Sequence, residues 1–369
     1  MKRKRALLAT TLACAGGVCH AQSSVQLYGS IDAGLTYVTN EGGSKNFKTD
    51  NGIISGNRWG FKGVEDLGGG ISTIFKIEGG FNISSGKANQ GGAIFGRQDW
   101  VGLQGPFGTF KIGNQYDMVN DFVTVYNVSY DGSGYANHQG DFDRIAGDRN
   151  HNAVKYTSNV YGGFQAGAMY AFSNTAGDFH DGSAWSAGGQ YNGGPVSVGI
   201  AYSSLATPTL DPYAAIGTPL FFGTTVATYS ASGAATDTAT AFQLKSMHAL
   251  DVGGSYRAGK WLFEGNFTNT TLNAFTASSV MHVYEGGVEY DFTPVVRGVL
   301  GYQHTTFQGH TWNQGSGGLA YRLSKRTKVY VSGDYVKASS GVDADLGGNF
   351  TPARSRSQAD ARVGIYTVF

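Results

Sequence analysis

The chain has 369 residues and a formal net charge of +1, with 57 glycines and 14% charged residues. This balance shows no basic excess and argues against a nucleic-acid partner. Beyond residue 21 the sequence has no apolar stretch long enough for a transmembrane helix and no sustained helical periodicity. The composition therefore predicts an all-β chain, either soluble or embedded in a membrane.

The first 21 residues have the features of a secretory signal peptide. Four basic residues, Lys2 to Arg5, precede an apolar run over 6–18, and Ala21 supplies a small residue for cleavage. Cleavage would remove both cysteines and four positive charges, which lowers the formal net charge from +1 to −3. An exported chain without disulfides must be stabilised by other means. We expect residues 22–369 to form a single domain.

Segments of about ten residues with alternating apolar and polar side chains recur along the rest of the chain. The first is "VQLYGSIDAGLTYV" over 25–38, in which Leu27, Ile31 and Leu35 lie on one face and Gln26 and Asp32 on the other. Similar segments occupy 163–172, 260–269, 283–292 and 327–336. This period of two predicts strands with one apolar face.

Two kinds of connection alternate between these segments. Short turns are expected at 192–195, 257–260, 291–294 and 323–326, and long Gly-rich loops at 40–52, 83–93, 116–150, 205–240 and 337–356. Such alternation is typical of a meander barrel with tight turns on one rim and long loops on the other. The number of segments predicts an antiparallel barrel of about sixteen strands.

A soluble β-sandwich or propeller would show the same alternation. Aromatic residues, however, recur at strand ends on the apolar face, as lipid-facing strands require at the headgroup level. They are Tyr37, Trp59, Phe81, Trp100, Tyr170, Tyr202, Tyr256, Trp261, Tyr290, Phe292, Tyr302 and Phe369. The opposite face is too charged and too rich in glycine for a packed core, whereas a water-filled lumen tolerates it. We therefore predict a transmembrane barrel.

The last strand, "RVGIYTVF" over 362–369, ends on Phe369 without a polar tail. A lipid-exposed strand edge cannot exist in a membrane, so the last strand must pair with the first. We expect it to pair with 25–32 and to place Phe369 in the aromatic girdle.

The chain resembles the general porins of the Gram-negative outer membrane, most of all the betaproteobacterial type. The resemblance is carried by "SSVQLYGSIDAGLTYV", "NRWGFKGVEDLGGGISTIFKIEGGF", "FGRQDWVGLQGPFGTFKIGNQYD", "HNAVKYTSNVYGGFQAGAMYAF" and the final aromatic residue. It implies an outer-membrane homotrimer that contacts lipid and lipopolysaccharide and passes ions and small hydrophilic solutes by passive diffusion. It further implies that the barrel assembly machinery recognises Phe369, and that the third long loop folds into the lumen opposite wall arginines.

Strand alternation identifies candidates for that wall. With Trp59, Phe75, Trp100 and Val154 facing outward, the basic side chains that point inward are Arg58, Lys62, Lys76, Arg97, Arg149 and Lys155. Three of them, Arg58, Arg97 and Arg149, also match the family's wall arginines by local motif. In the loop over 116–150, Asp117, Asp121 and Asp131 are the acids expected to face them. The loop lacks the Pro-Glu-Phe-Gly-Gly tip of enterobacterial porins, which leaves open which aspartate reaches the pore. Charges of opposite sign across the gap would orient dipolar solutes.

Other functions have weaker support in the sequence. A substrate-specific channel, or an adhesin that uses the loop over 205–240, is the main alternative, because long surface loops often carry binding functions. An outer-membrane enzyme is less favoured, since the sequence contains no G-x-S-x-G, H-E-x-x-H or P-loop motif. We expect no cofactor, no metal site and no catalytic residue.

Overall fold

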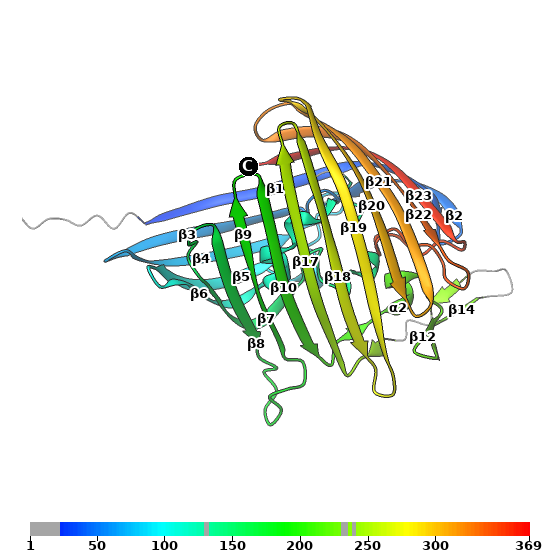
Figure 1. Ribbon diagram of the computed structural model, residues 1–369, viewed down its shortest axis with the longest axis horizontal. Coiled ribbons are helices and arrows are strands. Elements are labelled where there is room, and N and C mark those ends of the chain that lie inside the picture. Colours follow the sequence, from blue (N-terminus) through cyan, green and yellow to red (C-terminus); the bar gives the residue numbers. More distant parts are fainter. Residues whose placement is uncertain (1–22, 129–132, 230–234, 238–240) are drawn as a thin grey trace, which may run out of the picture.

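The computed structural model describes residues 23–128, 133–229, 235–237 and 241–369, and the expected signal peptide over 1–21 lies outside them. Most of the described chain forms one antiparallel sheet (Figure 1). No helix in the described ranges is long and apolar enough to cross a membrane. The strands of the sheet are β1 (Ser24–Glu41), β2 (Ser44–Asn51), β3 (Arg58–Gly68), β4 (Ile71–Gly80), β5 (Gln98–Gly105), β6 (Gly108–Tyr116), β7 (Arg149–Thr157), β8 (Phe164–Ala171), β9 (Ala184–Gly193), β10 (Val196–Ala206), β17 (Ser246–Ala258), β18 (Trp261–Asn273), β19 (Ser278–Thr293), β20 (Val296–Phe307), β21 (His310–Arg322), β22 (Thr327–Ala338) and β23 (Ser357–Val368).

The sheet closes on itself because β1 pairs with β23 along one edge and with β2 and β3 along the other. Since β2 and β3 pair with successive halves of β1, they count as one interrupted strand, and the described barrel has sixteen strands around its circumference. This confirms the predicted antiparallel barrel of about sixteen strands. Closure leaves no unpaired edge facing the membrane.

The closing register differs from the expected one. The last strand pairs with Ser30–Val38 of β1, so the closing pairing lies farther along β1 than the expected 25–32. The ladder extends to the last residue, where Phe369 and Gly29 exchange both backbone hydrogen bonds at 3.1 Å. The Phe369 ring lies where a Gly29 side chain would be, since an added Cβ would come within 2.3 Å of it. The side chain of Phe369 is 46% exposed on the outer face.

The expected long loop over 40–52 is a tight hairpin instead. Gly42 and Gly43 both have positive φ, at 62° and 97°, which lets β1 turn directly into β2. The chain then leaves the sheet over 52–57 and rejoins it as β3. The polar composition of this stretch concealed the strand, because β2 alternates only Phe47 with charged and polar neighbours.

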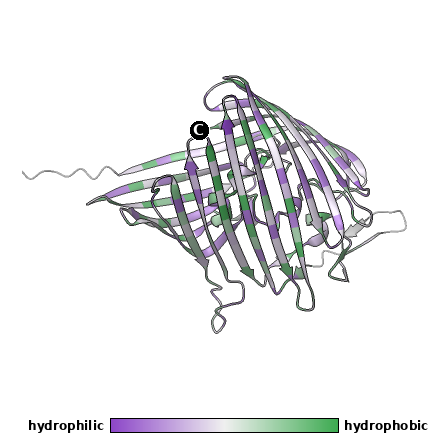
Figure 2. Ribbon diagram, in the orientation of Figure 1, coloured by the Kyte–Doolittle hydropathy of each residue, from purple (hydrophilic) through white to green (hydrophobic). Residues whose placement is uncertain are grey.

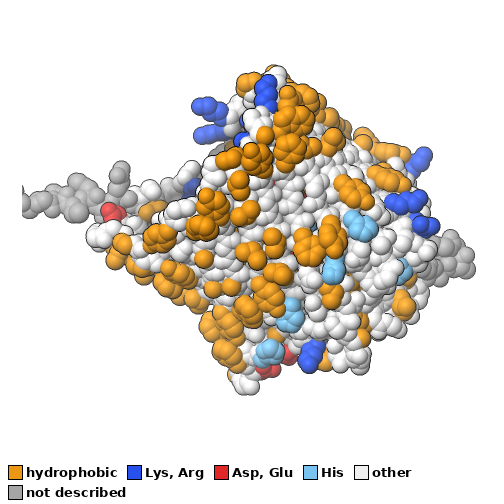
Figure 3. All heavy atoms as spheres, in the orientation of Figure 1, with side chains coloured by type: hydrophobic (Ala, Val, Ile, Leu, Met, Phe, Trp, Pro, Cys, Tyr) orange, Lys and Arg blue, Asp and Glu red, His pale blue; other side chains and the backbone are white. Residues whose placement is uncertain are grey.

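Hydrophobic and hydrophilic residues are interspersed along the strands (Figure 2), and burial shows that they lie on opposite faces of the wall, as the alternation predicts. Outward positions on β1 and β23 carry exposed apolar side chains, among them Leu27 at 54% and Val363 at 51% exposure. Inward positions on the same strands are buried and polar, including Asp32 and Arg362, which lie within 3.5 Å of each other. Figure 3 shows the apolar side chains spread over the outer surface. A surface of this kind is stable only when it faces lipid.

Long connections gather at the rim opposite the tight turns (Figure 1). Their elements are β11 (Thr209–Leu210), α2 (Pro212–Ile216), β12 (Leu220–Phe221), β13 (Thr224–Thr225), β14 (Ala227–Tyr229), β15 (Ala235–Asp237), β16 (Phe242–Gln243) and, before β5, the 3-10 turn η1 (Gln90–Gly92). Tyr213, Ile216 and Phe221 are buried in a hydrophobic cluster with Trp312 and Leu346. The expected adhesive loop over 205–240 is thus partly folded back onto the barrel.

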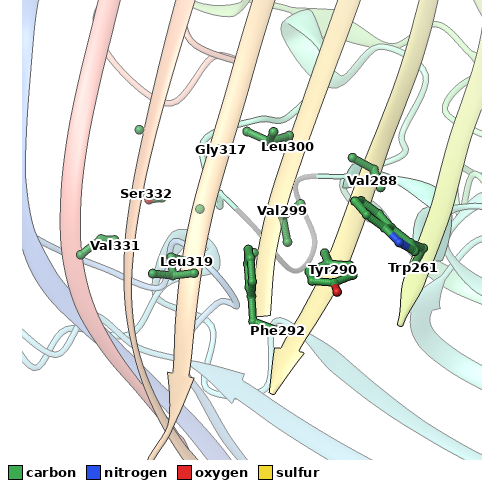
Figure 4. Close-up of a pocket in the computed structure, with 13 residues that line it drawn as sticks. Trp261, Val288, Tyr290, Phe292, Val299, Leu300, Gly317, Leu319, Val331 and Ser332 are labelled. Atoms are coloured by element: carbon green, nitrogen blue, oxygen red, sulfur yellow. The ribbon is translucent and has the colours of Figure 1, made fainter. Parts of the chain in front are cut away.

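The outer wall also carries an apolar groove of about 760 Å³ between β18 and β22 (Figure 4). Gly298, Gly317 and Gly333 supply its floor, and Leu319 and Phe292 are among the side chains that border it. The groove lies on the lipid-facing side and has no ionisable lining residue apart from the Tyr290 phenol, so it is not the site at which a solute would be selected.

Candidate functional site: a basic constriction

The residues between β6 and β7, 117–148, form the lumen loop. It contains α1 (Met118–Phe122), η2 (Thr124–Tyr126) and η4 (Gln139–Asp141). Met118, Phe122 and Tyr126 are buried in a hydrophobic cluster with inward residues of β7–β10, including Met169 and Ala201. Burial of this apolar face holds the start of the loop against the inner wall.

Glycines on the inner wall make room for the lumen loop. An added Cβ at Gly199 of β10 would lie 2.0 Å from the backbone oxygen of Phe122, and one at Gly253 of β17 would lie 2.6 Å from Tyr126. Farther along the loop, an added Cβ at Gly301 of β20 would lie 2.5 Å from the Val128 side chain. These contacts explain why the inward face is rich in glycine: the loop occupies the space that side chains would fill.

Gly199→Val is expected to displace α1 from the wall and to destabilise the docked loop by about 1–3 kcal/mol, because the added side chain would overpack against the backbone of Phe122. Faster hydrogen exchange of the amides of 118–126 would show this. Gly286→Val is the matched control, since a Cβ at Gly286 meets nothing within 4 Å. Equal exchange in both variants, with both barrels folded, would contradict the seating role of Gly199.

The structure brings Arg58, Arg97 and Arg149 together around one polar cavity of about 200 Å³. Three segments that are distant in the sequence, β3, the residues just before β5 and β7, provide them. The cavity is completed by Gly52, Ile53, Ile54, Ser55 and Gly56 from the interruption between β2 and β3, by Tyr116, and by Asn120, Thr124, Asn127, Gly134, Asn137, Ile145 and Ala146 of the lumen loop. We call this cavity the constriction, because the sequence predicts that these arginines line the narrowest part of a pore.

Tyr116 orients two of the arginines. Its hydroxyl accepts hydrogen bonds from Arg97 Nη2 at 2.9 Å and from Arg149 Nη2 at 2.7 Å, and its ring lies 4.7 Å from the Arg149 guanidinium. Arg97 also donates to Glu78 at 2.9 Å and is nearly buried. Arg58 donates to the hydroxyls of Ser30, at 3.0 Å, and Ser55. The hydrogen bonds of Arg58 and Arg149 thus go to neutral oxygens.

Alternation alone does not place Arg149. A bulge interrupts β7, with Asn152 at φ 55° and a register shift against β6. The contact with Tyr116, which lies directly across from Arg149 in the ladder, sets its direction. Strand alternation gave no indication of Tyr116 as a functional residue, nor of the backbone and side chains of 52–56.

Two of the expected loop acids, Asp117 and Asp121, are paired with other cations than these arginines. Asp117 is fully buried, accepts from the backbone N–H groups of Val119 and Asn120 at the start of α1, and lies 2.5 Å from Arg144. Capping and ion pairing therefore keep its carboxylate inside the loop. Asp121 lies 2.5 Å from Lys155, and Asp131 lies outside the described residues.

Cations consequently outnumber anions at the constriction. Among the lining residues that the structure describes, none is acidic. Lys155 is buried and is held by Asp121 and by the carbonyl oxygen of Tyr116 at 2.8 Å. Lys62 and Lys76 line a second cavity of about 490 Å³ nearer the turn rim, together with Arg58 and Glu78. Lys76 is 3.3 Å from Glu78.

A buried clamp ties the far half of the lumen loop to the wall. His138 Nδ1 lies 2.6 Å from Asp143 and Nε2 lies 3.4 Å from Glu285 of β19, while Thr268 of β18 donates to Asp143 at 2.8 Å. Burial alone would lower the pKa of His138, but the carboxylates of Asp143 and Glu285 raise it well above its usual value. A raised histidine pKa stabilises the clamp below that pKa, and the contribution is lost as pH rises through it.

The comparisons with known proteins agree with this architecture. Residues 6–341 match the Gram-negative porin family. The chain belongs to this family. The porin is 28% identical over 369 residues to an outer membrane porin protein of Bordetella pertussis, a match that covers 91% of this chain and 94% of the relative. It is 34% identical over 178 residues to outer membrane porin protein 32 of Delftia acidovorans, covering 46% of this chain and 50% of the relative.

Solved structures show the same fold. The porin superposes on the anion-selective porin from Comamonas acidovorans with a TM-score of 0.75 and 23% identity, covering 94% of this chain and 100% of that one. OmpT of Vibrio cholerae in its trimer form gives a TM-score of 0.68 at 17% identity, covering 94% and 99%. Family membership and the barrel confirm the predicted location in the outer membrane. The proteins from Bordetella pertussis, Delftia acidovorans and Comamonas acidovorans are named as porins.

Within the described residues, no cluster of three or more His, Cys, Asp or Glu could hold a metal ion. The polar groups around the constriction are instead hydrogen-bond donors and fixed positive charges. Such groups can replace part of the hydration shell of a passing anion without a chemical step.

Proposed function

We propose that this porin forms a water-filled channel for passive diffusion of ions and small hydrophilic solutes, with a constriction that favours anions. The observation that carries the proposal is the convergence of Arg58, Arg97 and Arg149 on a cavity without a described acidic lining residue. Selectivity is set where a pore is narrowest, so these charges outweigh the net charge of −3 expected for the mature chain.

In the proposed channel, Arg58 and Arg149 attract the anion, and the lumen loop narrows the passage. Ser30 and Ser55 hold Arg58, and Tyr116 holds Arg149. Lys62 and Lys76 extend the basic path toward the turn rim, and Lys155 fixes Asp121 of the loop. Asp131 remains a prediction as an acid of the loop that faces the passage. The structural neighbour named as anion-selective supports the same preference.

We further propose a homotrimer, as in the trimer form of OmpT, and a role of Phe369 in recognition by the barrel assembly machinery. The exposed terminal ring, held by Gly29 at the end of the closing ladder, supports that role.

Recordings from the purified protein in a planar bilayer test the function. We expect current steps in groups of three that do not saturate at high salt, and a reversal potential in a KCl gradient with the sign of chloride preference. Saturating current that a particular solute blocks would favour a substrate-specific channel. Folded protein without conductance would contradict the proposal.

A further inference from the structure

Histidines occupy one level of the lipid-facing wall. On β10 and β17–β20, outward positions near the turn rim are apolar, and toward the loop rim they form an aromatic row of Tyr202, Phe267, Tyr284 and Tyr302. Adjoining this row on its loop side are His248, His282 and His304. Figure 3 shows histidine side chains in an oblique row on this surface. Long loops of outer-membrane barrels face the cell exterior, so these histidines lie at the headgroups of the outer leaflet.

The histidines are isolated from other charges. The described outward positions of β10 and β17–β21 contain no Asp, Glu, Lys or Arg. The next strand, β22, contributes Lys337, which lies level with His304 across Asn313. A positive charge on these six strands can therefore arise outside the lumen only by protonation of imidazole.

His282 and His304 flank Tyr284, with ring centroids 6.4 Å from it on either side. His282 also stacks on Phe267 at 6.0 Å. Its Nδ1 is buried and has no hydrogen-bond partner within the described chain, so Nε2 is the nitrogen left to meet a ligand. His304 Nδ1 lies 2.8 Å from Asn313 Oδ1, an acceptor, so Nδ1 carries the proton and Nε2 is the nitrogen that protonation charges. Two imidazoles and a hydroxyl-bearing ring thus share one exposed patch.

We propose that His282, Tyr284 and His304 bind the phosphate group of a lipid headgroup in the outer leaflet, and that binding strengthens as the two imidazoles become protonated. Charge-assisted hydrogen bonds to phosphate oxygens supply the attraction. The groups that face the imidazoles are Phe267, Tyr284, Tyr302, Thr306, Asn269 and Asn313, with Lys337 beyond. None is a carboxylate, so the lipid phosphate is the counter-ion of the protonated site. The inference rests on the outer-membrane location of the proposed channel and not on its ion preference.

Native mass spectrometry of the purified full chain tests the site. The probes are lipid A with both phosphates and the same lipid A after dephosphorylation, offered at about pH 5.5 and about pH 8, on either side of the usual imidazole range. We expect the wild type to retain several-fold more phosphorylated lipid at the lower pH and to show no pH dependence with the dephosphorylated lipid. His282→Asn together with His304→Asn should abolish the pH dependence. Inorganic phosphate should not compete, because the acyl chains hold the headgroup in place.

Two further variants complete the test. His282→Lys with His304→Lys should retain the phosphorylated lipid at both pH values, and His180→Asn, in the loop before β9, should behave as the wild type. Equal retention of both lipids, or an unchanged pH dependence in the double Asn variant, would overturn the proposal. Competition by inorganic phosphate would also overturn it. These side chains face away from the lumen, so conductance recorded on the same samples separates this failure from failure of the channel.

Discussion

Replacing Arg58 and Arg149 together by glutamine is expected to lower the preference for chloride over potassium by about tenfold. A unit charge at 4 Å contributes about 1 kcal/mol to an ion in water, and no described carboxylate lining the constriction would compensate the loss. Both arginines are held by neutral oxygens, and glutamine can keep part of these hydrogen bonds. The reversal potential in a KCl gradient measures the change.

Arg326→Gln is the control for this pair, because Arg326 lies in the exposed turn between β21 and β22. Its removal subtracts charge from the molecule without changing the constriction. The effect of the double variant should shrink at high ionic strength, since salt screens exposed charges. If Arg326→Gln shifts the reversal potential as much as the double variant does, the selectivity does not arise at the constriction.

Replacing Arg144 by methionine is expected to destabilise the docked lumen loop by about 3–5 kcal/mol, because Asp117 would keep a buried charge without a partner. Arg144 Nε lies 2.5 Å from Asp117, and both side chains are at most 5% exposed. The start of α1 would lose its anchor while the strand ladders stay intact. Hydrogen exchange of the amides of 118–126 should accelerate, and single-channel current should become noisier.

Two further variants serve as controls for Arg144→Met. Asp148→Asn removes the more exposed partner of Arg144, which is 48% accessible, and should cost less than about 1 kcal/mol. Adding Asp117→Asn to Arg144→Met removes both charges and keeps a capping side chain, so it should restore much of the protection. Fast exchange in the double variant equal to that of Arg144→Met alone would show that the ion pair does not hold the loop.

The alternation of residues within single strands was sufficient to predict the wall of this barrel. Alternation of apolar and polar side chains predicts which face each strand turns to the membrane, because the side-chain period of a strand is two. Alternation alone therefore assigns Arg58 and Lys62 to the lumen, with no knowledge of their tertiary contacts. The same argument explains Phe369, whose ring continues the outward row of β23 through Val363 and Ile365.

Local pattern was insufficient wherever the backbone departs from that period. The tight turn at Gly42 and Gly43 allows a segment that we expected to be a loop to form β2. The bulge at Asn152 interrupts the inward–outward alternation of β7, so alternation does not predict the direction of Arg149. Paired glycines such as Gly188-Gly189 and Gly253-Gly254 indicate that another segment packs closely against the inner face of the wall. Their partner in the lumen loop could not be named from sequence, since these contacts join residues far apart in the chain.

By itself, the sequence determined the fold class, the membrane-facing surface and the basic character of the inner wall, because each depends on periodicity and composition within single strands. Only the tertiary structure decided which charges meet. Asp117 forms an ion pair with Arg144 and caps α1, and Asp121 forms an ion pair with Lys155. The Tyr116 hydroxyl accepts hydrogen bonds from both Arg97 and Arg149. Charge balance at a constriction depends on contacts across the lumen, and such contacts exist only once the barrel has closed and the loop has docked.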